Sequence, residues 1–176
     1  MRILAIDPGS ERSAMLLLAD GKPERFDIFD NAQVEAVILN CKFAAWKLPS
    51  GEIVALSPDR FVCEMIASYG MPVGREVFET CVWIGRFCAA AEQAGLRANR
   101  IYRKDEKMHL CHSMKATDAN IRAALIDRFG PGREKAIGTK KAPGPLYGIH
   151  DDVWAALAVA VTYEEMQKPG LVAMEL

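Results

Sequence analysis

No hydrophobic run in this 176-residue sequence is long enough to cross a bilayer. The longest apolar run, 153–161, is far shorter than the roughly 20 residues that a transmembrane helix needs. The first residues, MRILAIDPGS, are interrupted by Asp7 and do not show the pattern of a secretory signal peptide. We therefore expect a cytoplasmic protein with no membrane partner.

Familiar signatures of nucleotide and zinc binding are also absent. The patterns GxGxxG and GxxxxGK[ST] do not occur, so nucleotide binding through such phosphate loops is unsupported. The five cysteines form no CxxC pair and mostly lie in apolar stretches, so we expect reduced thiols in the core. The segment 109–112 holds two histidines and a cysteine, but no second cluster completes a tetrahedral site.

The charge is unevenly distributed along a chain of ordinary globular composition. With 51% hydrophobic and 26% charged residues, the length suits a single domain over 1–176. The net charge is −1, yet residues 97–141 hold twelve Lys or Arg against five Asp or Glu. Such an asymmetry is expected where one surface binds phosphate and another gathers carboxylates, although unrelated solvated helix faces would produce it too.

Hydrophobic periodicity and turn residues divide the chain into strands and helices. Strands are predicted at 2–6, 13–19, 25–29, 60–66 and 98–103, the first three antiparallel. Helices are predicted at 31–42, capped by Asn31, at 75–94, at 118–129, capped by Thr117, and at 151–166. This order favours an α/β fold in which helices cover both faces of a mixed five-stranded sheet.

Two further expectations concern the middle of the chain. The predicted helix over 75–94 has an inner stripe of Val77, Cys81, Ile84, Cys88 and Ala91. Residues 47–58 are expected to form a loop, and residues 130–148, rich in Gly, Pro and Lys, a flexible basic loop.

Acidic residues stand where three predicted elements begin, end or are interrupted. Asp7 ends the first strand at an Asp-Pro-Gly turn, and Glu64 interrupts an otherwise apolar strand. Asp151 and Asp152 open the final helix. Carboxylates from separate elements can hold a hard divalent ion such as Mg²⁺. Each acid also has a purely structural explanation, as a turn former, as the partner of a basic residue, or as a helix N-cap.

Together these segments resemble the RuvC-type Holliday-junction resolvases, and most closely the shorter RuvC-like proteins of bacteriophages. The resemblance spans nearly the whole chain and is carried by MRILAIDPGS, Cys63-Glu64, Glu106-Lys107-Met108 and the alanine-rich run 153–160. It implies an RNase H-like (retroviral-integrase-like) fold. It also implies a metal-dependent endonuclease that cuts four-way DNA junctions or related branched DNA.

The resemblance further implies roles for individual residues. Asp7, Glu64 and Asp152 would bind two Mg²⁺ ions, or Mn²⁺, with Asp151 as a further candidate ligand. Lys107 would lie near the scissile phosphate and offset its charge. The residues expected to contact DNA are Tyr69, Arg103, Lys104, Lys115, Lys140 and Lys141. Paired nicks across a junction need two sites, which implies a homodimer with the helix over 75–94 as a candidate part of its interface.

The last helix departs from the family pattern. The family has an Asp-x-x-Asp pair there, whereas this chain has Asp152 followed by Ala155. Asp151 lies four residues before Ala155 and so shares its helical face. A second family basic residue would fall near Asp118, which makes Lys115 the nearer candidate. This departure keeps open a junction-binding protein that has lost catalysis. An RNase H-like nuclease that processes RNA is a second alternative, because such enzymes also open with an Asp-x-Gly strand.

Overall fold

A five-stranded mixed sheet forms the centre of the computed structural model, which describes residues 1–43, 46–47, 51–68, 70 and 72–168. The strand order is β3-β2-β1-β6-β7. The strands are β1 (Arg2–Asp7), β2 (Arg12–Ala19), β3 (Lys22–Asp30), β6 (Arg60–Met65) and β7 (Ala98–Tyr102). The first three are antiparallel neighbours, as predicted, whereas β6 runs parallel to both β1 and β7.

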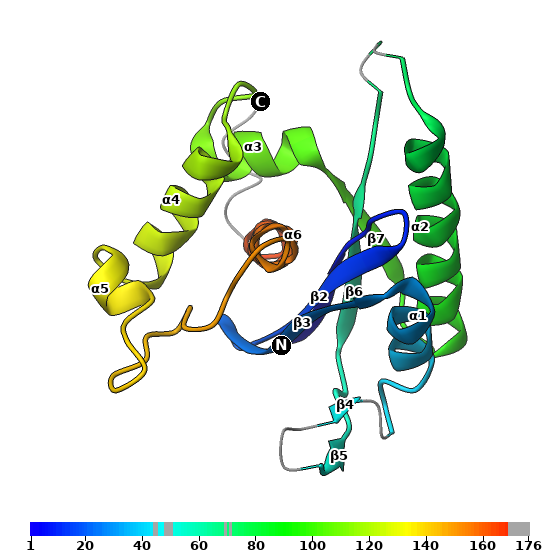
Figure 1. The fold of residues 1–176 in the computed structure, drawn as a ribbon, viewed down its shortest axis with the longest axis horizontal. Coiled ribbons are helices and arrows are strands. Elements are labelled where there is room, and N and C mark those ends of the chain that lie inside the picture. Colours follow the sequence, from blue (N-terminus) through cyan, green and yellow to red (C-terminus); the bar gives the residue numbers. More distant parts are fainter. Residues whose placement is uncertain (44–45, 48–50, 69, 71, 169–176) are drawn as a thin grey trace.

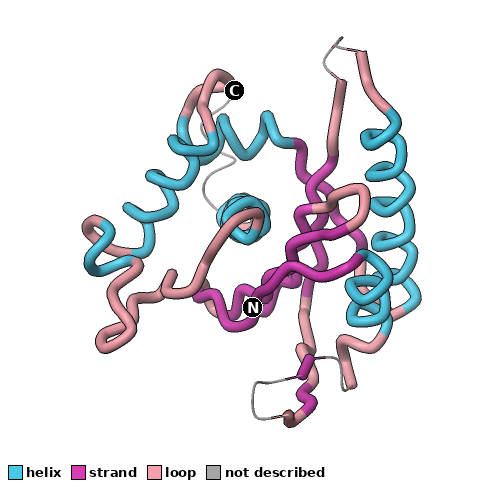
Figure 2. Tube along the Cα trace, viewed as in Figure 1, coloured by secondary structure: helices cyan, strands magenta, loops and turns pink. Residues whose placement is uncertain are grey.

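Helices cover both faces of this sheet, which confirms the predicted architecture (Figure 1). On one face lie α1 (Asn31–Leu39) and α2 (Arg75–Gln93). On the other lie α3 (Arg103–Cys111), α4 (Asp118–Phe129), the short α5 (Arg133–Ala136) and α6 (Val153–Met166). Figure 2 shows α6 enclosed between the strands and the outer helices. Within the described ranges, no helix is long and apolar enough to span a bilayer.

The two faces of β1 supply two separate hydrophobic cores. Ile3 and Ala5 point toward α6, whereas Leu4 and Ile6 point toward α1 and α2. A strand buried on both faces needs apolar residues at every position, which explains why this segment shows no polar alternation. Helix α6 is likewise buried over most of its length, and its alanines allow close packing against the sheet.

The structure corrects several predicted boundaries. Asp30, not Asn31, occupies the N-cap position of α1, and α6 begins at Val153 rather than at Asp151. Cys81 was predicted to face inward but is exposed, whereas Cys41 and Cys63 are buried as expected. The supposed loop over 47–58 contains β5 (Ile53–Val54), which pairs with β4 (Trp46–Lys47).

The basic segment 130–148 is packed against the rest of the protein rather than being an open loop. It contains α5, and both Ala136 and Leu146 are fully buried. The backbone N–H of Leu146 donates to the carbonyl of Ala136 at 2.8 Å. These contacts anchor the segment and leave Lys140 and Lys141 exposed at its tip.

The turn that follows Asp7 is held by side-chain hydrogen bonds. The Gly9 N–H donates to Ser13 Oγ at 3.2 Å, and the Asn31 side-chain amide donates to the Gly9 carbonyl at 3.0 Å. Ser13 Oγ in turn donates to Asn31 Oδ1 at 2.5 Å. A Cβ added at Gly9 would lie 2.3 Å from the carbonyl oxygen of Arg12. Only glycine therefore fits here without a shift of the backbone.

We predict that Gly9→Ala lowers the free energy of unfolding by about 1–3 kcal/mol, because the methyl group overlaps backbone that cannot move freely. Gly85→Ala is the matched control, since Gly85 lies inside α2 with no atom within 4 Å of the added Cβ. That substitution should stabilise the protein by about 0.5–1 kcal/mol. Urea unfolding of both variants measures the difference. Equal stabilities for Gly9→Ala and the unchanged protein would contradict the close approach.

Candidate active site

The first two predicted acids lie side by side at the end of two parallel strands. Ile6 of β1 is in register with Cys63 of β6, so the next residues, Asp7 and Glu64, are neighbours across the ladder. Both side chains extend on the face covered by α6, because side chains alternate along a strand. Sites in α/β sheets commonly form beyond the carboxyl ends of parallel strands.

A pocket of about 280 Å³ opens beside these two carboxylates. Its lining brings together all four acids that the sequence predicted as metal ligands. It also contains residues that the sequence did not suggest for the site. The complete lining is Asp7, Glu64, Arg103, Asp118, Ile121, Arg122, Asp151, Asp152, Trp154 and Ala155.

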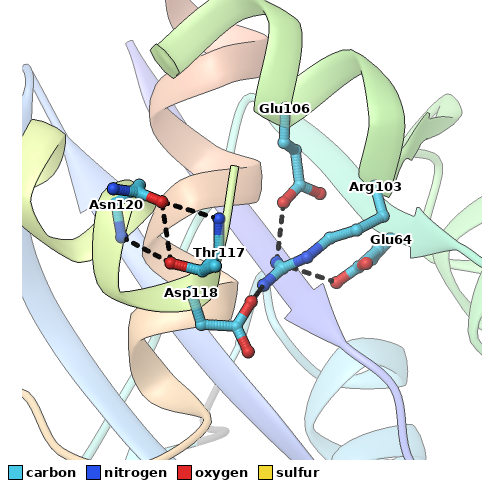
Figure 3. A network of polar contacts seen from close by, with 6 residues as sticks. All are labelled: Glu64, Arg103, Glu106, Thr117, Asp118 and Asn120. Atoms are coloured by element: carbon cyan, nitrogen blue, oxygen red, sulfur yellow. Dashed lines mark hydrogen bonds and ion pairs between the residues drawn. The ribbon is translucent and has the colours of Figure 1, made fainter. Parts of the chain in front are cut away.

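Arg103 connects three carboxylates from three different elements (Figure 3). Its Nη1 atom lies 2.9 Å from Glu106 Oε2, and its Nη2 atom lies 2.6 Å from Asp118 Oδ1. Nη1 also lies 3.8 Å from Glu64 Oε2. Glu64 therefore does pair with a basic residue, which was the structural explanation for its place in an apolar strand. Arg103 was predicted to bind DNA, but its charge here is engaged with acids.

The beginning of α4 is fixed by a capping box, which confirms the predicted cap at Thr117 (Figure 3). The Thr117 hydroxyl accepts from the Asn120 backbone N–H at 3.3 Å, and the Asn120 side chain accepts from the Thr117 N–H at 2.9 Å. Satisfying these backbone groups holds the first turn in place. Asp118 in that turn and Arg122 one turn later both line the pocket.

The electrostatics of the pocket reflect crowded carboxylates. Burial, followed by the negative charges of Glu64 and Asp152, holds the pKa of Asp7 well above its usual range. Burial disfavours the charge of Arg103, but Glu64, Glu106 and Asp118 outweigh it and raise the pKa of the guanidinium. Additional positive charge near Asp7 would thus be stabilising.

The donor set suits a hard divalent ion by its chemistry. Carboxylate oxygens are the ligands that Mg²⁺ and Mn²⁺ accept, and the crowding at Asp7 favours a cation. Within the described ranges, however, no three Asp, Glu, His or Cys side chains already converge as a ligand set. Binding of an ion would therefore require small side-chain movements that bring these carboxylates together.

The structure rules out the helix-capping explanation for Asp151. Asp152 occupies the N-cap position of α6, and its side chain accepts no hydrogen bond from the helix. Asp151 precedes it with a φ of 40° and an 80% exposed side chain, 3.2 Å from His150 Nδ1. Both acids line the pocket, and so does Ala155. Neither carboxylate is thus committed to holding the helix end.

The predicted DNA-binding residues lie mostly outside the pocket. Lys107 is half-buried on α3 and is not one of the residues that line the pocket. Four further lysines are exposed on the surface: Lys104, Lys115, Lys140 and Lys141. Tyr69 lies outside the described residues.

Sequence reasoning missed the site roles of Arg103, Asp118, Arg122 and Trp154. One signal was available, because Arg103 directly follows β7 and so comes to the same sheet edge as Glu64. Another was the i,i+4 spacing of Asp118 and Arg122, which places both on one face of α4. Neither signal shows which residues these side chains contact, because the contacts depend on how α4 packs against α6.

Glu106 provides a pH-dependent test of this network. It is fully buried, and burial together with Glu64 raises its pKa to about 9 despite the opposing Arg103. Between its ordinary value of 4.5 and that value, the folded state holds a proton that the unfolded chain has lost. The free energy of unfolding should therefore fall as pH rises through this window.

We predict that Glu106→Gln removes this loss, so that the variant gains stability relative to the unchanged protein as pH rises from about 5 to about 8. Urea unfolding at both pH values measures the effect. Glu134→Gln, at an exposed position on α5, is the control and should show no such trend. A stability difference for Glu106→Gln that does not change with pH would contradict the prediction.

Comparison with known proteins identifies the fold. No family model and no curated protein sequence matches the chain. Among solved structures, the chain is similar to Thermus thermophilus RuvC, with a TM-score of 0.64 and 17% identity over 94% of this chain and 96% of that one. A structure of T. thermophilus RuvC in complex with a Holliday junction substrate matches with the same values. The chain therefore has a RuvC-like fold, as the resemblance in the sequence implied, of the RNase H-like α/β type.

Proposed function

We propose that this chain is a metal-dependent endonuclease that cuts branched DNA, with the four-way junction as its substrate. The observation that carries the proposal is the placement of Asp7 and Glu64 side by side on parallel strands, in one pocket with Asp152. The likeness to a RuvC structure in complex with a Holliday junction substrate supports the choice of substrate.

Asp7, Glu64 and Asp152 would hold Mg²⁺ or Mn²⁺, with Asp151 able to reach the same pocket. Bound divalent ions would supply an activated water and stabilise the leaving oxygen during phosphodiester hydrolysis. The residues of the chain position these ligands. Strand register fixes Asp7 against Glu64, and the start of α6 brings Asp152 to them.

Exposed lysines offer a surface for the DNA backbone. Lys104 lies on α3, Lys115 just before α4, and Lys140 and Lys141 beyond α5. These elements lie on the same side of the sheet as the pocket (Figure 1). Phosphate contacts of this kind would position a junction without reading its sequence. Lys107 on α3 remains our candidate for a contact near the cut.

A second copy of the chain would allow two cuts across one junction. The outer face of α2 supports this part of the proposal because it exposes Phe78 and Val82, with 61% and 59% of their surfaces accessible. Ala89 lies on the same face two turns after Val82 and is also exposed. Its small side chain would permit close approach of a partner helix.

One observation favours the alternative of a junction-binding protein that does not cut. The guanidinium of Arg103 already neutralises part of the acidic pocket, so its carboxylates have a cationic partner without a metal ion. The proposed nuclease needs a metal ion in addition to this arginine, whereas a binding protein does not.

The decisive experiment compares cleavage of labelled four-way, Y-shaped and linear DNA and of single-stranded RNA, with Mg²⁺ and with a chelator. We expect nicks in the four-way junction only when Mg²⁺ is present. Asp7→Asn should abolish nicking and leave junction binding intact or tighter, because it removes a metal ligand and a negative charge. Binding without nicking by the unchanged protein would support the non-catalytic alternative, and preferential cleavage of RNA would support an RNA-processing nuclease.

The two neighbouring acids before α6 should differ in importance. We predict that Asp152→Asn eliminates nicking, whereas Asp151→Asn retains most of it. Asparagine is the suitable replacement at Asp151 because its φ of 40° is left-handed, a conformation that asparagine tolerates. Single-turnover nicking, with melting curves to confirm folding, measures both variants.

Equal inactivity of the two variants would mean that Asp151 has taken over the role of the acid missing at Ala155. In that case Ala155→Asp should partly restore nicking to Asp151→Asn, since both positions line the same pocket. Full activity of Asp152→Asn would show that the final metal ligand has been misplaced.

A further inference from the structure

Two arginines line the acidic pocket, and they are in opposite electrostatic situations. Arg103 lies within 4.0 Å of three acidic side chains, and the charges of Glu64 and Asp118 offset its own. Arg122 makes no ion pair with any residue in the part of the chain that the structure describes, and its guanidinium lies over an aromatic ring. Arg122 therefore brings to the pocket a positive charge that no paired carboxylate neutralises.

The ring of Trp154 holds Arg122 in place. The guanidinium carbon lies 4.5 Å from the ring centroid, a cation–π contact. Trp154 is only 8% exposed, so the ring is a fixed platform rather than a mobile surface side chain. Stacking occupies the flat face of the guanidinium and leaves its N–H donors, which lie in the plane, free to bind an anion.

Trp154 also sets where this charge lies. It follows Asp152 by two residues at the start of α6, and both side chains line the pocket. Arg122 reaches the same place from α4, whose first turn is held by its capping box. Two rigid helix ends thus determine the position of the guanidinium relative to the acids.

Charge balance shows what such a group would do. Five carboxylates line the pocket, those of Asp7, Glu64, Asp118, Asp151 and Asp152. A DNA phosphate approaching them would be repelled unless cations offset the repulsion. Arg103 is committed to the acids, and Lys107 does not line the pocket. Among the described residues, Arg122 is the cation that lines the pocket without an ion pair to a carboxylate.

We propose that Arg122 contacts the scissile phosphate directly and that Trp154 is its positioning residue. This assignment rests on the proposed nuclease function and adds a catalytic residue to it. Two N–H groups of Arg122 would donate to the non-bridging oxygens of the phosphate, a geometry that suits a guanidinium better than an ammonium. The contact would strengthen as negative charge builds up on these oxygens during attack by water.

The first test compares Arg122→Gln and Arg122→Lys with Arg128→Gln as the matched control. Arg128 lies on the same helix but pairs with Glu165 away from the pocket. At saturating protein, Arg122→Gln should slow single-turnover nicking about 10²–10³-fold. Arg122→Lys should recover part of the rate, and Arg128→Gln should nick as fast as the unchanged protein. Melting curves confirm that each variant folds.

A DNA substrate with an uncharged group at the cleaved position distinguishes a direct contact of Arg122 with the phosphate from an indirect effect. Junction binding is measured in a chelator, with either a normal phosphate or an uncharged methylphosphonate at the cleaved position. Arg122→Gln should weaken binding of the normal junction and leave binding of the methylphosphonate junction unchanged. An equal loss on both junctions would show that Arg122 acts elsewhere and would overturn the proposal.

The role of Trp154 is tested by comparing the nicking rates of single and double variants of Trp154 and Arg122. Trp154→Phe keeps an aromatic face, whereas Trp154→Leu removes it, so nicking should fall more with leucine. The double variant Arg122→Gln/Trp154→Leu should nick no more slowly than Arg122→Gln alone, because the platform acts through the arginine. A purely structural tryptophan would add its own loss to the double variant.

The outcomes distinguish this proposal from the proposed function. Nicking by the unchanged protein, loss with Asp7→Asn and full activity of Arg122→Gln would overturn only the role of Arg122. Absence of nicking on every branched DNA would overturn the nuclease function and this assignment together. A slow Arg122→Gln, with its binding loss confined to the normal phosphate, establishes both.

Discussion

Repulsion between the carboxylates of Asp7 and Glu64 is the constraint on which the rest of this structure depends. The register of β1 with β6 places the two acids next to each other, on a face sealed by α6. Burial itself, and then the negative charge of Glu64, raises the pKa of Asp7, and the low-polarity surroundings make the repulsion stronger than it would be in water. A fold that keeps both acids must supply positive charge to the same place.

Arg103 supplies this charge, and its partners explain the arrangement of the helices around the pocket. It begins α3 at the end of β7, next to Glu64 on β6, and reaches Asp118 at the start of α4. Its third partner, Glu106, is buried on α3 itself. The guanidinium thus joins the sheet to two helices and holds the acidic pocket together when no other cation is bound.

The same reasoning divides the basic residues of 97–141 into two groups. Arg103 and Arg128 are tied to carboxylates and serve the fold. Arg122 stacks on Trp154, and the exposed lysines face solvent, so these side chains remain able to meet phosphate. An excess of positive charge in the sequence is therefore only an upper limit on the charge that a nucleic acid would encounter.

The sequence by itself determined the five strands of the main sheet, four of the helices and the acids that stand at their ends, but it did not indicate α3, α5, β4 or β5. These features depend on local periodicity, turn residues and caps, so Asp7 at the end of β1, Glu64 within β6 and Thr117 before α4 were all correctly placed. The RuvC-like resemblance added the expected fold, which the structural comparison confirms.

Only the tertiary structure decided which charges meet. Arg103 and Asp118 are fifteen residues apart, and Arg122 and Trp154 are separated by all of α5 and the segment after it, so no local pattern could pair them. The packing of α3 and α4 against α6 brings them together. On the other face of the sheet, the packing of α2 leaves Cys81 exposed, and Asp151 lies just before the helix that was predicted to begin with it. Contacts between distant elements depend on how helices pack, which the local sequence does not encode.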